Sequence, residues 1–188
     1  MKYYKISGDF DHYDTCDIHI AHGIPLSLHM VDLDGSVQGD KWLPRIMVRH
    51  KDHPLGDYVD CLSGDILILT DSAIELLRPV MGKFEKLQLF SNYEKSYTAV
   101  NVLTVLNCVD YEKSEYIRFP QTDPNIIPRI MMFDRYVFRL DAIKNHHIFR
   151  IIDEPKSALF VDDVFVSEVE NLGITGFMFK QVWDSEVE

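Results

Sequence analysis

The sequence predicts an α+β protein with a single domain, in which a mixed, mostly antiparallel sheet carries two short strand–helix–strand units. Three observations favour this fold. Short apolar runs rich in β-branched and aromatic residues recur along the chain, with turn-forming residues between them. Two stretches show helical spacing of apolar residues, and each lies between two such runs. The length of 188 residues suits one domain and is enough to bury a sizeable core.

The clearer unit begins with the apolar run Ala158–Val161. Asp162 follows in the position of a helix N-cap, and Asp163 adds negative charge to the first turn. Gly173 stands where a helix ends on a left-handed residue, and the aromatic run from Phe177 continues as a strand. The expected core consists of Phe165, Val169, Leu172, Phe177 and Phe179 together with Leu103 and Phe149.

The second unit repeats this pattern over the same length, from Asp71 to Gly82, with Asp71 as the expected N-cap. The run Ile66–Leu69 precedes it, and the run Phe84–Phe90 follows it. Pro79 departs from the pattern, because proline removes a backbone hydrogen bond and disfavours a helical conformation at the residue before it. Both units lie within residues 65–188, which we interpret as the scaffold, while residues 1–64 form a more variable N-terminal part.

The remaining apolar runs predict further strands. The longest, Tyr97–Val109, is rich in valine and threonine, which favours a strand over a helix. Asn101 within it would need hydrogen-bond partners if buried. Pro120, Pro124 and Pro128 indicate an irregular connection. The other expected strands are Lys2–Ile6, a short strand around Ile18 and Ile20, Ile24–Val31, Ile46–Val48, Ile130–Leu140 and Ile148–Ile152.

The net charge of −11 is unevenly distributed. Residues 1–40 hold two lysines and seven aspartates, and residues 162–188 hold one lysine and seven acidic residues, so these ends carry −5 and −6. Residues 41–161 balance at sixteen bases and sixteen acids. An acidic chain repels phosphates, so we expect no nucleic-acid partner. Acidic ends would steer a basic protein partner, and simple solubility is the other explanation of the charge.

The sequence also indicates a compartment. Its start, MKYYKISGDF, lacks the apolar segment of a signal peptide, and no apolar run approaches the ~18 residues of a membrane span. Cys16, Cys61 and Cys108 are odd in number and scattered, which suits a reducing environment. We therefore expect a cytoplasmic protein with no membrane partner.

One stretch could bind a metal. His12, Cys16, His19 and His22 are zinc-ligand types within eleven residues. Their spacing matches no standard zinc motif, and one segment rarely supplies every ligand of a closed site. The chain also lacks a Gly-rich phosphate loop and a G-x-S-x-G motif. We expect no metal, no cofactor and no enzyme activity, and the alternative is a metal-dependent enzyme or metal-binding protein that uses residues 12–22.

Two stretches carry a recognisable pattern, AVNVLTVLNCVDYEKSEY (Ala99–Tyr116) and HIFRIIDEPKSALFVDDVFVSEVENLGITGFMF (His147–Phe179). It consists of N-V-L, an aspartate after six residues, E-K-S, an I-F-R strand, and G-x-x-G before an aromatic residue. The pattern resembles that of immunity protein family eleven of bacterial polymorphic-toxin systems. The chain departs from it at Asp162-Asp163, where the family usually begins the helix with serine and glutamate. The matching positions are Asn101, Val102, Leu103, Asp110, Glu112, Lys113, Ser114, Ile148, Phe149, Arg150, Gly173, Gly176 and Phe177.

The resemblance implies a small cytoplasmic protein that is encoded beside a toxin and neutralises it by tight stoichiometric binding. This agrees with the acidic ends, which would face a basic toxin surface. Besides the metal-dependent alternative, a structural or regulatory binding module remains as a third class. The sequence leaves the oligomeric state open.

One acidic loop near the N-terminus is the expected contact with the toxin, because a loop is free to follow the shape of a partner. Its aspartates lack the glycine and terminal glutamate of a calcium loop, so we expect solvated charge. At the other end, Asp162 and Asp163 would be occupied by helix capping, and Glu186 and Glu188 would fray. The expected contact residues are Asp9, Asp11, Asp14 and Asp17.

Overall fold

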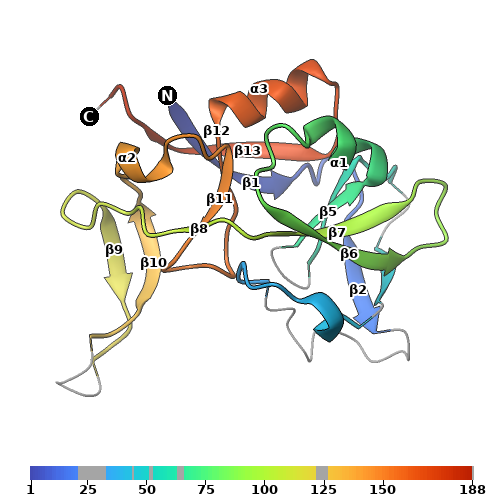
Figure 1. Ribbon diagram of the computed structural model, residues 1–188, viewed down its shortest axis with the longest axis horizontal. Coiled ribbons are helices and arrows are strands. Elements are labelled where there is room, and N and C mark those ends of the chain that lie inside the picture. Colours follow the sequence, from blue (N-terminus) through green and yellow to red (C-terminus); the bar gives the residue numbers. More distant parts are fainter. Residues whose placement is uncertain (21–32, 44, 51–52, 63–65, 122–126, 188) are drawn as a thin grey trace.

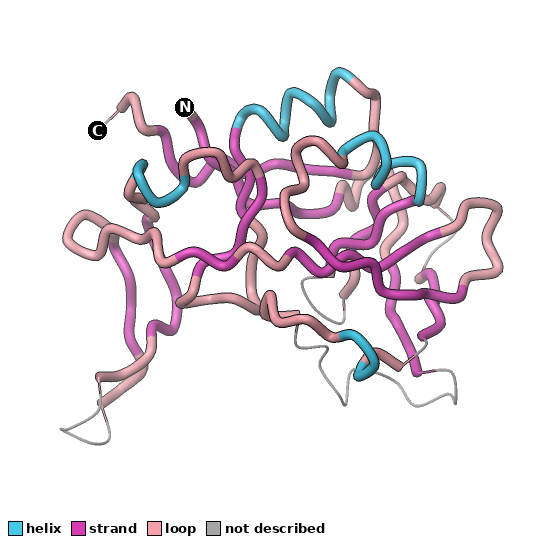
Figure 2. The backbone as a smooth tube through the Cα atoms, viewed as in Figure 1, coloured by secondary structure: helices cyan, strands magenta, loops and turns pink. Residues whose placement is uncertain are grey.

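The computed structural model describes residues 1–20, 33–43, 45–50, 53–62, 66–121 and 127–187. Among these residues, thirteen strands form three sheets, connected by three α-helices and one short 3-10 helix (Figure 1). The protein is mainly sheet with few helices, as Figure 2 shows, which agrees with the predicted α+β class. The expectation of one mostly antiparallel sheet is wrong, because the strands are divided among three sheets and both larger sheets are mixed.

The five-stranded sheet has the order β13 (Phe177–Asp184), β1 (Lys2–Gly8), β12 (Phe160–Asp162), β11 (Ile148–Ile151) and β8 (Val105–Leu106). β1 pairs antiparallel with β12 on one side and with β13 on the other. The pair of β11 with β8 is parallel. The first strand of the chain therefore completes a sheet whose other strands all come from its second half.

The six-stranded sheet contains the second strand–helix–strand unit and most of the N-terminal part. Its one parallel pair joins β3 to β6. The predicted strand Ile24–Val31 lies outside the described residues. The strands of the six-stranded sheet are, in order, β2 (Cys16–Ile20), β3 (Arg45–Arg49), β6 (Phe84–Phe90), β7 (Tyr97–Val102), β5 (Leu67–Thr70) and β4 (Tyr58–Asp60).

The predicted strand Tyr97–Val109 is divided between the two larger sheets. β7 ends at Val102, and the Leu103 amide donates to the Lys83 carbonyl at 3.0 Å. The Thr104 carbonyl then accepts from the Arg150 amide at 2.8 Å, which leads into β8. The chain changes sheets at these two residues, so one apolar run contributes to both.

Asn101 in β7 is fully buried, and its Nδ2 has the partners that burial requires, whereas its Oδ1 has none among the described residues. Its Nδ2 donates to the Ser36 carbonyl at 2.8 Å and to a Glu85 carboxylate oxygen at 3.3 Å. Glu85 also accepts from the amides of Gln38 and Gly39, at 2.9 and 2.7 Å. These bonds anchor the segment that leads into the 3-10 helix η2 (Gly39–Lys41).

Helix α3 (Asp163–Asn171) begins as predicted. The Phe165 amide donates to Oδ1 of Asp162 at 3.0 Å, which makes Asp162 the N-cap. The second carboxylate oxygen of Asp162 lies 2.8 Å from Nδ1 of His147, just before β11. One buried carboxylate thus joins the helix start to the neighbouring strand.

The end of α3 is also confirmed. Gly173 has a φ of 64°, and its amide donates to the Glu170 carbonyl at 3.1 Å. The Ile174 amide donates to the Val169 carbonyl at 3.1 Å. These two bonds are the Schellman arrangement that closes a helix on a left-handed glycine. Leu172 is 37% exposed, so its assignment to the core is wrong.

The second unit is correct in order but not in its details. Helix α1 (Asp71–Leu77) is shorter than predicted and ends before Pro79. Its N-cap is Thr70, whose hydroxyl accepts from the Ala73 amide at 3.2 Å, and Asp71 is the first helical residue. The proline limits the helix because its ring clashes with the preceding turn.

The remaining elements lie before β11 in the chain. Strands β9 (Glu115–Arg118) and β10 (Ile130–Arg135) form a separate antiparallel hairpin, and helix α2 (Leu140–Ile143) follows it. The structure shortens the predicted strand Ile130–Leu140 to β10, and β4, β9 and α2 are additions that the sequence did not indicate.

Three apolar clusters fill the interior. The first lies beneath α1 and α3 and takes residues from both larger sheets, including Leu69 and Val102 of the six-stranded sheet and Ile148 and Val161 of the five-stranded sheet. Phe165 of α3 belongs to it as well. The second contains Phe149 and packs between the five-stranded sheet and the hairpin, so Phe149 does not share the core of α3. The third lies within the six-stranded sheet around Ile18. Within the described residues, no helix has the length and apolarity needed to cross a membrane.

Candidate functional site

The predicted acidic loop connects β1 to β2. The Asp9 amide donates to the Gly176 carbonyl at 3.0 Å, which places the loop beside the turn between α3 and β13. The Asp9 carboxylate accepts from Nδ1 of His12 at 3.0 Å. That hydrogen bond with His12 holds the pKa of Asp9 below its usual value, and the same bond raises the pKa of His12. The two side chains therefore favour each other's charged forms.

Asp14 differs from the other aspartates of the loop. Its side chain is fully buried, and Oδ2 lies 3.1 Å from Nε of Arg49. Its Oδ1 accepts from the Thr15 amide at 2.9 Å. A buried carboxylate with these partners holds the loop against β3, so the expectation that Asp14 presents a free charge to a partner is wrong.

The other two aspartates face solvent to different degrees. Asp11 is exposed at the tip of the loop. Asp17 lies in β2 with its carboxylate 2.9 Å from Nε2 of His50, and its side chain is 30% exposed. The structure thus brings Asp9 and Asp11 to one exposed loop and places Asp17 on the strand that follows.

The alternative metal site does not assemble. Cys16 and His19 lie in β2, where residues three apart point to opposite faces of the sheet. Cys16 is fully buried beside Cys61, and the hydrogen bond with Cys61, followed by burial, raises the pKa of the Cys16 thiol, whereas zinc binds thiolate. His12 is paired with Asp9, and His22 lies outside the described residues. The described residues contain no group of three or more His, Cys, Asp or Glu side chains that could hold a metal.

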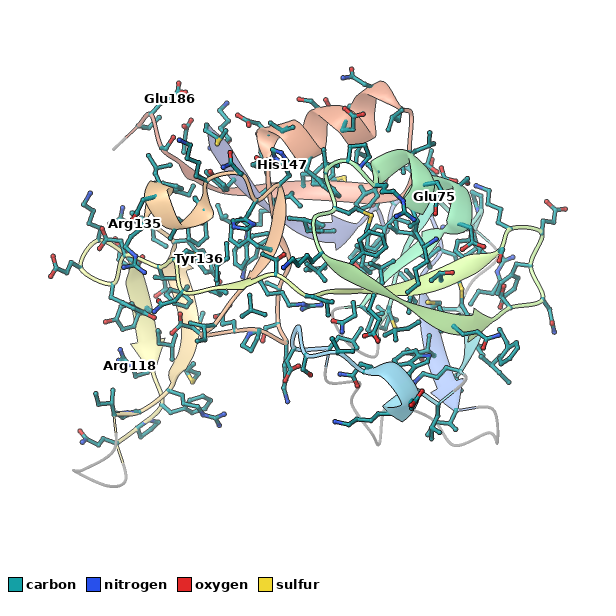
Figure 3. All side chains as sticks on the ribbon, viewed as in Figure 1. Glu75, Arg118, Arg135, Tyr136, His147 and Glu186 are labelled. Atoms are coloured by element: carbon teal, nitrogen blue, oxygen red, sulfur yellow. The ribbon has the colours of Figure 1, made fainter. Side chains whose placement is uncertain are left out.

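A second acidic surface surrounds α3 and the chain termini. Glu170 is exposed on α3, and Glu186 follows β13 at the end of the chain (Figure 3). The N-terminal amine lies 2.8 Å from Glu186 and 3.8 Å from Asp184, so these two acids are paired with it and the expected fraying of Glu186 is not observed. Glu188 lies outside the described residues. β1 lies beside β13 and the Asp9 amide bonds to Gly176, so the acidic β1–β2 loop adjoins the start of β13, whereas Asp17 lies in the six-stranded sheet.

Cations lie both beside these acids and elsewhere on the molecule, since Lys2 and Lys5 are in β1 and Lys180 is in β13. Arg118 and Arg135 are on the β9–β10 hairpin, away from α3 in the view of Figure 3, and Arg135 pairs with Glu115 of the same hairpin. Acids and bases are therefore mixed over the described surface, and the exposed acids of interest are those of α3 and the β1–β2 loop.

Sequence reasoning did not single out Glu170, which lies in the predicted scaffold helix. Its position three residues before the glycine stop, on the same helical face as Val166 and Gly173, was the signal that could have placed it at the surface near β13.

These features describe an α+β protein with an acidic loop beside the turn between α3 and β13. Residues 89–184 match the Immunity protein family (Imm11), which is just over half of the chain. The protein therefore belongs to the Imm11 immunity protein family, and its function is toxin-neutralising immunity. The matched region runs from the end of β6 to the end of β13, and the resemblance seen in the sequence is confirmed. A search of curated proteins found no match.

Proposed function

We propose that this protein neutralises its cognate toxin by stoichiometric binding, without catalysis, and that the toxin surface it covers is basic. Membership of an immunity family supports the binding of a toxin. The basic character of the toxin is inferred from where the acidic residues of this protein lie. The loop of Asp9 and Asp11 adjoins the turn between α3 and β13, beside which Glu170 is exposed, and residues 41–161 carry no net charge. Opposite potentials on two proteins accelerate their encounter.

The acidic loop is our proposed first point of contact. Asp9 and Asp11 lie in it and Asp17 follows it, and all three reach solvent to some degree. Asp14 is excluded from the contact because its buried carboxylate holds Arg49. The proposal therefore keeps three of the four aspartates that the sequence indicated.

We also propose that the chain acts as a single domain in the cytoplasm, without a nucleic-acid or membrane partner. The cluster beneath α1 and α3 supports one domain, because it takes residues from both strand–helix–strand units. The three free cysteines are all buried, which suits a reducing compartment. The net charge of −11 disfavours phosphate backbones.

The test measures the association rate with the purified product of the adjacent toxin gene over a range of salt concentrations. We expect the triple variant Asp9→Asn, Asp11→Asn, Asp17→Asn to associate several-fold more slowly than the parent, with a weaker salt dependence. Asp14 stays intact so that the fold is preserved.

The matched control neutralises three exposed acids from the balanced middle of the chain, as Glu94→Gln, Glu112→Gln and Asp134→Asn. It has the same net charge as the loop variant. Unchanged rates for the loop variant, or equal slowing in both variants, would exclude a specific role of the loop. A toxin that neither co-purifies with this protein nor is inhibited by it would contradict the proposed function as a whole.

A further inference from the structure

A groove of about 540 Å³ lies between α3 and the outer strand β13. Figure 1 shows the helix running along this part of the five-stranded sheet. The groove is mainly apolar, with Glu170 as its one charged lining residue. Its apolar lining includes Tyr4, Val166, Val169, Ile174, Phe177 and Phe179.

The groove is open because α3 is short and is placed over the inner strands. The helix packs against β12 and β1, and it ends at Asn171 in the glycine-closed turn. Phe177 and Phe179 on β13 are therefore only half-buried, although they belong to the apolar cluster beneath the helix. Their rings stack at a centroid distance of 5.5 Å and an interplanar angle of 9°. A flat aromatic surface is thus exposed beside the helix.

The edge of β13 is open as well. β13 is the first strand of its sheet, with β1 on one side and no strand among the described residues on the other. Natural edge strands are usually blunted by charge, proline or a covering element. The first three residues of β13 carry no charge, Met178 is 51% exposed, and the first charge is Lys180. Backbone hydrogen-bonding groups and apolar side chains are therefore offered together at Phe177–Phe179.

Acidic groups surround one end of this groove. Glu170 lines it, and the Asp9 amide is bonded to Gly176, the residue just before β13. The loop that carries Asp9 and the exposed Asp11 therefore adjoins the groove, and no basic residue lines it. Charge complementarity favours an occupant that is apolar and also carries a positive charge.

We propose that the α3–β13 groove binds an extended apolar segment of the cognate toxin that carries a lysine or arginine, and that this segment adds as a strand to the open edge of β13. The inference rests on the proposed function and specifies its interface. In strand addition, backbone hydrogen bonds supply affinity, and alternate side chains enter pockets that supply specificity. Here the pocket is the space beside Phe177 and Phe179, and the base pairs with Glu170.

The test compares two neighbouring substitutions on α3. Val166 lines the groove, and Ser167 is exposed on another face of the same helix. Val166→Lys places a long charged side chain in the groove, where it fills the space of the toxin segment and lies one helical turn from Glu170, the acid that the toxin's base would meet. We therefore expect it to weaken binding of the adjacent gene's toxin by about tenfold or more. Ser167→Lys makes the same change in net charge and should alter the affinity by less than about twofold. Melting curves verify that both variants are folded.

Hydrogen exchange on the unmodified protein gives a second, independent reading. Amides of β13 that face away from β1 exchange readily in the free protein, and a toxin strand paired with them would slow their exchange. In the complex, we expect slower exchange for those amides of Phe177–Gln181 that face away from β1. If the toxin binds and is inhibited without this protection, and Val166→Lys binds normally, the inference is overturned while the proposed function stands.

The occupant could also be a second copy of this chain, and the same measurements separate that case. A free protein that is dimeric, with β13 already protected, would overturn the proposal in favour of self-association. A wild-type protein that fails to bind or inhibit the toxin would overturn the proposed function and this inference together.

Discussion

At the scale of single residues, local rules account for the ends of α3 but not for the acidic loop. Asp162 and Gly173 are recognisable in the sequence, because each role depends on residues within one helical turn. Thr70 was missed because Asp71 beside it is an equally good capping residue, and only the backbone conformation decides between them. Asp14 was assigned to the surface because its partner Arg49 is 35 positions away, so no local pattern indicates its burial.

The stop of α3 gives a prediction for Gly173. A Cβ at this position would have no atom within 4 Å, so the φ of 64° is the sole source of strain on substitution. Gly173→Val should lower the free energy of unfolding by more than about 1 kcal/mol, and Gly173→Asn should lower it less, because asparagine tolerates the left-handed region. Denaturant unfolding of both variants measures the difference. Equal losses would contradict a conformational origin.

The pair of Asp9 and His12 gives a prediction for pH. The pKa of His12 is raised above 6.5, so its stabilising contribution is present below that value and lost as the pH rises through the raised pKa. The pKa of Asp9 is lowered below 3.8, so its contribution is lost only as the pH falls through that lower value. The interaction should therefore be strongest between these limits. We expect Asp9→Asn to return the His12 pKa, measured by NMR titration, to its ordinary value. An unchanged His12 titration would show that the contact does not form in solution.

At the scale of elements, β1 is the strand whose place in the sheet is hardest to predict from the sequence. The sequence predicts a strand at Lys2–Ile6, and the structure extends it to Gly8. Its place between β12 and β13 depends on pairing across more than 150 residues, which no local pattern can show. The division of Tyr97–Val109 is similar. The break follows from hydrogen bonds to Lys83 and Arg150, both distant in sequence.

The central position of β1 predicts unequal roles for its two tyrosines. Tyr3 is 1% exposed and contacts the rings of Phe138, Phe149 and Trp183, while Tyr4 faces the opposite side and is only half-buried. Tyr3→Ala should lower the free energy of unfolding by about 3–5 kcal/mol, the range for large buried aromatic residues, and Tyr4→Ala should lower it less. Chemical denaturation of the two variants tests this. A Tyr3→Ala protein as stable as the parent would exclude β1 from the core.

At the scale of the whole molecule, the sequence predicts the α+β class and the acidic ends, but not how the acids are arranged on the surface. The acidic ends are visible in the sequence, yet the closeness of the β1–β2 loop to the start of β13 follows from the pairing of β1 with β13. The same pairing exposes the edge of β13 and places the Asp9 loop beside the end of α3. The groove was not predictable, because Val166, Glu170 and Phe177 come together only when the helix leaves β13 uncovered.

Membership of the immunity family follows from residues 89–184, but the sheet that carries the proposed interface also requires β1, outside that region. The N-terminal part therefore contributes both a central strand and the acidic loop. The acidic loop is recognisable in the sequence as a candidate contact, whereas the groove is not, although all its lining residues except Tyr4 lie within residues 89–184.

The measurement that tests the central claim most directly is a titration of the toxin's activity with this protein. The product of the adjacent toxin gene is assayed at a concentration well above the dissociation constant, with increasing amounts of the immunity protein. Stoichiometric binding predicts a linear fall in activity that ends sharply at a fixed whole-number ratio, with full activity recovered when the complex is dissociated. Loss of activity at far below stoichiometric amounts would indicate catalysis, and undiminished activity at a large excess would contradict neutralisation by binding.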